Sequence, residues 1–205
     1  MGFNHILSEG LSSLIFVVKR SVFLMWSPYK TMRAICNDSD LLQVVFIFFA
    51  IGMYFFSANQ LKEYVHPPIF LFLLTVVHYL LTVLYFGIFS FLSSNHSKQG
   101  VRPFLLLFAY ALIPTLVWFA VNSLLYALIP PPRTPSFLGK GFSVLYISFS
   151  VGILMWKIIV TYLAIRFATG FRFFRIMYSM IIYIAILIPY AIFLYSLHIF
   201  RIPFL

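Results

Sequence analysis

Long apolar runs alternate with short polar segments along this chain. Five runs interrupted by few polar residues cover residues 41–57, 69–92, 103–128, 142–165 and 176–200. A helix needs about 20 apolar residues to cross the ~30 Å hydrocarbon core of a bilayer, and the run at 41–57 is near the lower limit. The pattern therefore predicts five transmembrane helices, joined as one bundle over residues 41–205.

A membrane β-barrel is the competing architecture for an apolar chain. Barrel strands are about ten residues long and alternate apolar with polar side chains. The stretch at 41–49 contains a single polar residue, Gln43, and does not alternate. We therefore predict an all-α polytopic membrane protein, because a helix satisfies its own backbone hydrogen bonds in lipid.

Residues 1–40 have a different pattern and form a predicted cytoplasmic arm. Apolar residues recur there at helical spacing: Leu11, Leu14, Ile15, Val18, Val22 and Met25. Lys19 and Arg20 interrupt this stretch, which suits an amphipathic helix lying in the membrane interface better than a span. Packing of the helix on the bundle is the alternative. In the interfacial arrangement, the arm's bases contact anionic lipid headgroups: Lys19, Arg20, Lys30 and Arg33.

Particular residues predict how the helices begin and bend. Asp38 and Asp40 precede the first span, where carboxylates cap a helix and complement its dipole. Pro114 and Pro189 lie inside the third and fifth spans and are predicted to kink them, since proline removes a backbone donor.

Composition supports a membrane protein and charge orients it. The chain is 63% hydrophobic and only 9% charged, which excludes a soluble domain and a disordered chain. Of its 14 Lys and Arg residues, those in the arm and in the second-to-third and fourth-to-fifth loops outnumber those on the other side. The positive-inside rule then predicts a cytoplasmic N-terminus and an external C-terminus. The membrane is the cytoplasmic membrane of a prokaryote, or the Golgi or endoplasmic reticulum of a eukaryote.

Reactive groups are few. All four acidic residues lie outside the predicted spans, which disfavours proton-coupled transport and hydrolysis by paired carboxylates. The five histidines have no helical spacing for a metal, and neither HExxH nor GxSxG occurs. We predict no enzyme activity, no catalytic residue, no metal and no cofactor. Nucleic-acid binding is not expected either, because the bases are divided among several loops.

Lys157 is the one Lys, Arg, Asp or Glu side chain that lies deep in a predicted span. It belongs to a stripe repeating every seven residues, with Ser143, Ser150 and Ala164. An intramembrane cation must face the bundle or a wet cavity. It either holds an anionic ligand or lipid headgroup, or makes a structural hydrogen bond to a carbonyl or hydroxyl. The candidate polar site comprises Lys157, Asn122, His78 and Tyr110, and His78 is expected to make an interhelical hydrogen bond.

Several motifs resemble the Yip family of Rab-interacting membrane proteins. Gly100-Val101-Arg102-Pro103 followed by Phe108-Ala109-Tyr110-Ala111-Leu112-Ile113-Pro114 resembles the opening of that family's third span. Trp156, the run Tyr162-Leu163-Ala164-Ile165-Arg166 and the proline in the fifth span continue the similarity. The resemblance implies a five-span bundle with a cytoplasmic N-terminus; eukaryotic members bind small GTPases and one another in vesicle trafficking. The short arm here, without a long acidic region, favours a prokaryotic relative.

Two functions follow as expectations. The first is a non-enzymatic membrane scaffold of Yip type that binds a membrane-protein partner or a second copy, linked to membrane organisation or trafficking. The alternative is a small carrier or lipid-handling protein with a polar cavity around Lys157. A carrier needs a cavity at membrane depth, whereas a scaffold needs a filled core and an exposed face of small residues.

Overall fold

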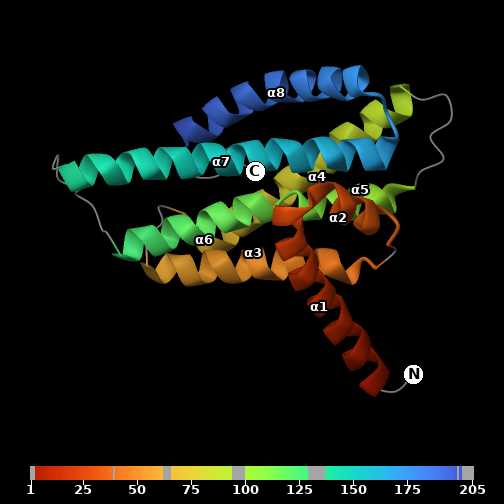
Figure 1. Ribbon diagram of the computed structural model, residues 1–205, viewed down its shortest axis with the longest axis horizontal. Coiled ribbons are helices and arrows are strands. Elements are labelled where there is room, and N and C mark those ends of the chain that lie inside the picture. The colour runs from red at the N-terminus through yellow and green to blue at the C-terminus, as the bar shows by residue number, and fades with distance from the viewer. Residues whose placement is uncertain are drawn as a thin grey trace.

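The computed structural model describes residues 3–38, 40–61, 66–93, 100–128, 137–197 and 199. Within these ranges the chain is helical, without a strand (Figure 1). The helices are α1 (Phe3–Trp26), α2 (Pro28–Cys36), α3 (Leu42–Leu61), α4 (Pro68–Ser93), α5 (Val101–Tyr110), α6 (Ile113–Leu128), α7 (Phe137–Thr169) and α8 (Phe173–Ser196). Five stretches are long and apolar enough to cross a membrane, which confirms the predicted all-α polytopic fold.

The central span consists of two helices. Proline has no N–H, so Pro114 cannot donate to the carbonyl four residues earlier. At this point α5 ends at Tyr110 and α6 begins at Ile113, with Ala111 and Leu112 in a turn between them. The predicted kink at Pro114 is therefore a break. By contrast, α8 continues through Pro189 and curves towards its C-terminal end (Figure 1).

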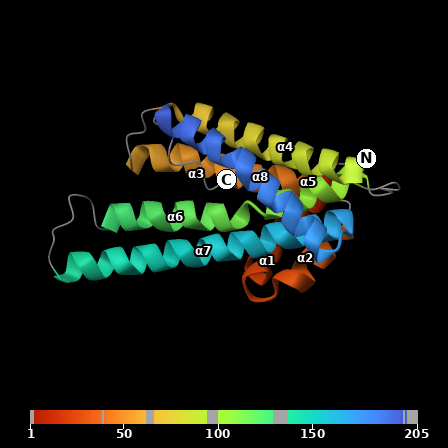
Figure 2. The same cartoon turned by 90° about the horizontal axis from the view of Figure 1, so that it is seen from above.

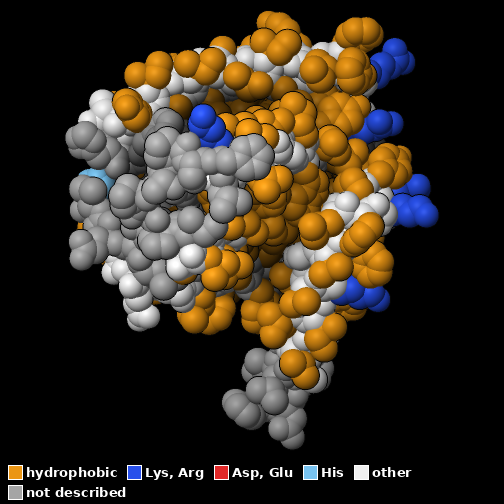
Figure 3. All heavy atoms as spheres, turned by 60° about the vertical axis from the view of Figure 1, so that its left-hand side comes forward, with side chains coloured by type: hydrophobic (Ala, Val, Ile, Leu, Met, Phe, Trp, Pro, Cys, Tyr) orange, Lys and Arg blue, Asp and Glu red, His pale blue; other side chains and the backbone are white. Residues whose placement is uncertain are grey.

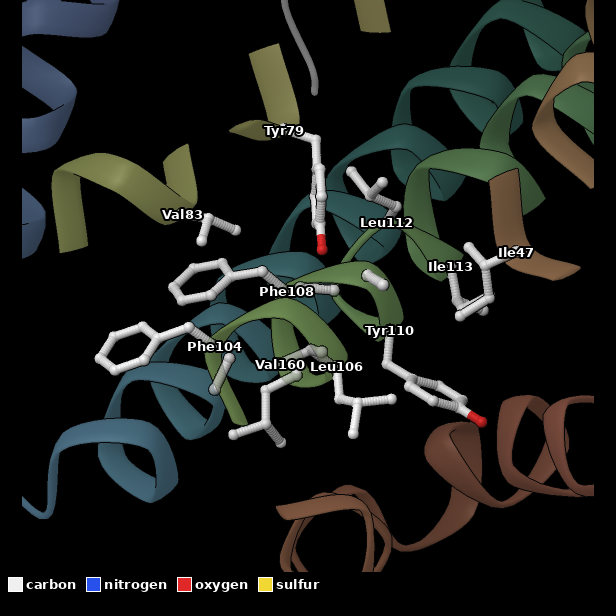
Figure 4. Packing of buried hydrophobic residues seen from close by; sticks show 14 of the residues in the cluster. Ile47, Tyr79, Val83, Phe104, Leu106, Phe108, Tyr110, Leu112, Ile113 and Val160 are labelled. Carbon is white, nitrogen blue, oxygen red and sulfur yellow. The ribbon is translucent and has the colours of Figure 1, made fainter. Parts of the chain in front are cut away.

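The core lies around α5. Buried side chains from α3, α4 and α7 surround it, among them Ile47, Val83 and Val160, while Leu106 and Leu107 of α5 are fully buried (Figure 4). Two thirds of the most apolar part of Val101–Leu125 is buried. In a bilayer the lipid covers outward apolar faces, so only such a central helix needs to be buried by protein.

The outer helices are far more exposed. Only 6% of the most apolar part of α7 and 17% of that of α8 is buried. In Figure 2, α7 extends beside α6, and α8 crosses obliquely over the bundle. These two helices offer most of their circumference to lipid or to a partner.

The arm folds as two helices, and α1 packs on α3 by a narrow face that contains Ser13, Val17 and Leu24. All six apolar residues of the predicted stripe point away from the bundle, each at least 41% exposed. The helix thus packs on the bundle and also exposes an apolar face suited to lipid. The short α2 buries Met32 and Ile35 and lies against α7 and α5.

The cations lie mainly at one end of the described bundle. Contacts there join α2 to the end of α7, through the rings of Tyr29 and Phe167, and α8 to the end of α4, where Arg175 Nη1 donates to the Ser93 carbonyl at 3.1 Å. Figure 3 shows most visible Lys and Arg side chains along one edge of the molecule. The described parts of the segments grouped by the positive-inside count therefore share one end in space.

Candidate functional site

Lys157 lies where the broken span meets α7. Its Nζ donates to Thr115 Oγ1 at 2.9 Å, and Thr115 stands in the first turn of α6, just after the break. Two helical turns before Lys157 on α7, Ser150 Oγ accepts a hydrogen bond from Trp118 Nε1 at 3.1 Å. Ala164 is fully buried. Three members of the seven-residue stripe thus pack inward, whereas Ser143 is exposed and bonds its own helix at the Gly139 carbonyl.

Two small cavities adjoin Lys157. One of about 50 Å³ is lined by residues of α4, α5, α7 and α8 and by the turn at Ala111 and Leu112. Besides Lys157, its lining residues with polar groups are His78, Tyr79, Thr82, Thr161 and Tyr183. The other, about 20 Å³, lies between α6 and α7 and is lined by Thr115 and Ser150. A water needs about 10–15 Å³ of such space, so these cavities have room for a few waters or one small polar group.

His78 joins α4 to α8 as predicted. Its Nε2 lies 3.4 Å from the Tyr183 hydroxyl, and its ring stacks on Tyr190 with centroids 5.6 Å apart. The Tyr183 hydroxyl also lies 2.8 Å from Thr82 Oγ1, which donates to the His78 carbonyl within α4. This interhelical network forms the α8 side of the Lys157 cavity.

The other two residues of the predicted polar site lie elsewhere. Tyr110 points to the arm, and its hydroxyl donates to Gln43 Oε1 at 2.6 Å. Asn122 is half-buried on α6, seven residues or about 10 Å beyond Thr115, and lines neither cavity. The structure therefore brings His78 to Lys157 but corrects the placement of Tyr110 and Asn122.

A second polar cluster, around Gln43, fixes the arm to the bundle. Arg20 Nη1 lies 2.6 Å from Asp38 Oδ2 and 2.7 Å from Gln43 Oε1. Gln43 Nε2 donates to Asp38 at 2.9 Å, and Ser13 Oγ donates to Asp40 at 2.6 Å. Arg20 was expected at lipid headgroups; instead it pairs within the protein, because α1 turns its polar face inward. The other predicted headgroup residues, Lys19, Lys30 and Arg33, are exposed.

Asp38 and Asp40 have different tasks in this cluster. Burial alone would raise the pKa of the Asp38 carboxyl, but hydrogen bonds from Gln43 and Arg20 lower it below its ordinary value of 3.8. Asp40 Oδ1 accepts the backbone N–H of Leu42 at 3.0 Å, which confirms a carboxylate cap at the start of α3. The sequence analysis missed Gln43 as the centre of the cluster; a lone polar residue in an apolar run was the available signal.

Two larger grooves open on the outside of the bundle. One of about 310 Å³ separates α4 from α8 and shares His78, Thr82 and Tyr183 with the inner cavity. The other, about 630 Å³, lies between α4 and α5 and is lined almost entirely by apolar residues. Among the described residues, no three His, Cys, Asp or Glu side chains come together as a metal site.

Comparison with known proteins identifies no relative of this chain. No family model matches the chain, and neither the curated proteins nor the solved structures give a significant match. The resemblance to the Yip family therefore stays a prediction, and the chain is assigned here only as an all-α integral membrane protein with five helices able to span a bilayer.

Proposed function

We propose that this protein is a non-enzymatic membrane scaffold that acts by lateral contact, with a second copy of the chain as its first partner. The observation that carries the proposal is the exposed face of α7. Only 6% of its most apolar part is buried, yet that face bears small residues, Gly141, Ser148 and Gly152.

Small residues on a lipid-facing helix favour a helix partner. Ser148 and Gly152 are four residues apart, so they lie on one face, and Gly141 lies seven residues before Ser148 on the same face. A Cβ added at Gly141 or Gly152 would meet nothing within 4 Å. Such a face lets two backbones approach closely, and the resulting van der Waals packing favours helix association in membranes.

The interior supports a scaffold over a carrier of water-soluble solutes. The cavities at Lys157 measure about 50 and 20 Å³, far below the ~300–1,000 Å³ of ligand pockets. Among the residues that the structure describes, every buried side-chain nitrogen and oxygen has a hydrogen-bond partner. A filled and satisfied core suits a protein that works through its surface.

The arm and the family resemblance are consistent with this function. Lys19, Lys30 and Arg33 are exposed. In the proposed function they contact anionic headgroups, while the exposed apolar face of α1 enters the interface. We place this end in the cytoplasm by the positive-inside rule, in the cytoplasmic membrane of a prokaryote or the Golgi or endoplasmic reticulum of a eukaryote.

Disruption of the α7 face tests the proposal. We expect Gly152→Ile to shift the purified protein from dimer to monomer, because the added side chain holds the backbones apart. The measurement is single-molecule photobleaching of the fluorescently labelled protein at low density in lipid vesicles. The matched control is Ile147→Phe, which adds bulk on another exposed face of α7 and leaves the dimer intact. A monomeric wild type, or a dimer that Gly152→Ile leaves unchanged, would contradict the proposal.

Lipid handling is the second candidate function. It is favoured by the groove between α4 and α8, which reaches the polar network beside Lys157 from the lipid-facing side of the bundle. A ligand that enters by this route never crosses the filled core.

A further inference from the structure

Two adjoining spaces, a groove and a cavity, lead from the outside of the bundle to Lys157. The outermost is the groove between α4 and α8, about 310 Å³, at the lower end of the range of ligand pockets. Its walls include Leu81, Leu84 and Ile88 of α4 and Ile186 and Leu187 of α8. Leu81, Leu84, Ile88 and Ile186 are each at least half exposed, so the groove is open to hydrocarbon.

The floor of the groove is polar. His78, Thr82 and Tyr183 line both the groove and the 50 Å³ cavity behind it, so these side chains form the wall between the two spaces. The wall is held by one contact of 2.8 Å between Thr82 Oγ1 and the Tyr183 hydroxyl and by one of 3.4 Å between Tyr183 and His78. A ligand that passes from the groove into the cavity has to displace the Tyr183 side chain, whose ring also packs on Tyr85 and Phe86.

A lysine side chain and a helix N-terminus lie behind this wall. Lys157 lines the inner cavity together with Thr161, and the turn at Ala111 and Leu112 brings the N-terminal end of α6 to the same place. A helix N-terminus carries a partial positive charge, and broken helices in transporters direct such ends at anionic groups. The predicted spans contain no Asp or Glu. The cavity is therefore suited to an anion that comes from outside the spans.

We propose that the groove between α4 and α8 binds a long-chain fatty acid, with its carboxylate in the inner cavity at Lys157. The inference rests on the second candidate function, lipid handling, and is independent of self-association through α7. The apolar walls take the chain, and the ammonium of Lys157 and the hydroxyl of Thr161 supply donors for the carboxylate.

The size of the inner cavity selects the headgroup. About 50 Å³ holds a carboxylate but not a glycerophosphate with its substituents. Burial of a carboxylate in a membrane needs a countercharge as well as hydrogen bonds. An ester or an alcohol can accept a hydrogen bond from Lys157 but carries no charge to pair with it. The free acid is thus the ligand that the charge and volume of the site favour.

Binding of radiolabelled palmitate to the full chain, purified in detergent, tests the proposal. We expect saturable binding that weakens at least tenfold in Lys157→Met and in Ile186→Trp, which fills the groove. The matched controls are Lys140→Met, which removes an exposed cation at the other end of α7, and Ile184→Trp, which adds the same bulk on the opposite face of α8. Both controls bind as the wild type does.

Competition and folding checks make each outcome decisive. Unlabelled palmitate displaces the label, whereas methyl palmitate and lysophosphatidic acid do so at least tenfold less well. Thermal unfolding and elution volume verify that each variant is folded; if Lys157→Met is not, Thr161→Val and Ile186→Trp carry the test. Equal competition by the ester, or saturable binding that Lys157→Met leaves unchanged, would overturn this site while leaving lipid handling open at another site. The lack of any saturable binding would overturn both, and neither result bears on the α7 dimer.

Discussion

Gln43 forms hydrogen bonds with four polar side chains, although it lies in an apolar run predicted to be a membrane span. Its side chain contacts Arg20, Asp38, Asp40 and Tyr110 and is fully buried. A buried amide of this kind is stable only when its donors and acceptors are satisfied together. The cluster therefore orients α1 against α3 and ties both to the central span.

Asp38 makes the attachment of the arm dependent on pH. The pKa of its carboxyl is lowered in the folded protein, so its stabilising contribution is fully present above the ordinary value of 3.8 and is lost as the pH falls through the lower folded pKa. We expect the unfolding temperature in detergent to fall below pH 4 in the wild type. Asp38→Asn should be less stable at pH 7 and should lose less on acidification.

The control for this prediction is Lys30→Gln, which removes an exposed charge of the arm outside the cluster. Its pH dependence should match that of the wild type. If Asp38→Asn and the wild type lose stability in parallel from pH 7 to pH 3, the carboxyl of Asp38 does not act as described.

At the scale of elements, the break between α5 and α6 explains both the success and the failure of the predicted polar site. Lys157 stands out in the sequence because a charge in an apolar run is costly and must be buried or solvated. Its hydroxyl partner, Thr115, lies immediately after Pro114. A break changes the rotation of the second half of a span, and hydropathy does not record that rotation. Tyr110 and Asn122 were therefore wrongly placed beside Lys157.

The same reasoning applies to α1. Its apolar stripe was predicted from spacing and is exposed as expected, but the angle at which α1 crosses α3 depends on Ser13 and Arg20 finding partners 27 and 18 residues away. Single-sequence patterns identify which face is apolar. They do not say which polar residues meet across elements, so the cluster at Gln43 could not be predicted.

Pro114 gives a test at this scale. We expect Pro114→Ala to restore an N–H that donates to the Tyr110 carbonyl, because the two positions are four residues apart. Hydrogen–deuterium exchange of the detergent-solubilised protein should then slow in peptides that cover residues 108–118 and stay unchanged in α3. Pro189→Ala is the matched control, since α8 is already continuous. Unchanged exchange at 108–118 would mean that packing, and not the proline, breaks the span.

For the whole molecule, most Lys and Arg side chains that the sequence count assigned to the cytoplasmic side lie at one end of the described bundle. Lys30 lies at that end on α2, and Lys140 lies near the start of α7, one span away from Arg166. The orientation predicted by the positive-inside rule therefore assigns these two lysines to opposite sides of the membrane.

Cysteine labelling tests this orientation. In a Cys36→Ser background, we expect Lys140→Cys to react with a membrane-impermeant maleimide in intact cells and Lys30→Cys to react only after permeabilisation. The native Cys36 is a poor competitor in any case, because burial raises the pKa of its thiol and Sγ contacts the Phe167 carbonyl at 3.4 Å. The reverse labelling pattern would invert the topology without altering the fold.

The uneven burial of the spans has a consequence for how the protein is made. The most buried span, Val101–Leu125, packs on α3 and α4, and both of these helices are synthesised before it. Another neighbour, α7, is synthesised later; its Lys157 donates to Thr115 and its Trp156 to the Leu24 carbonyl. The central span can therefore pack on α3 and α4 before α7 is synthesised. When α7 enters the bilayer, it packs on the central span and on the arm in the same step.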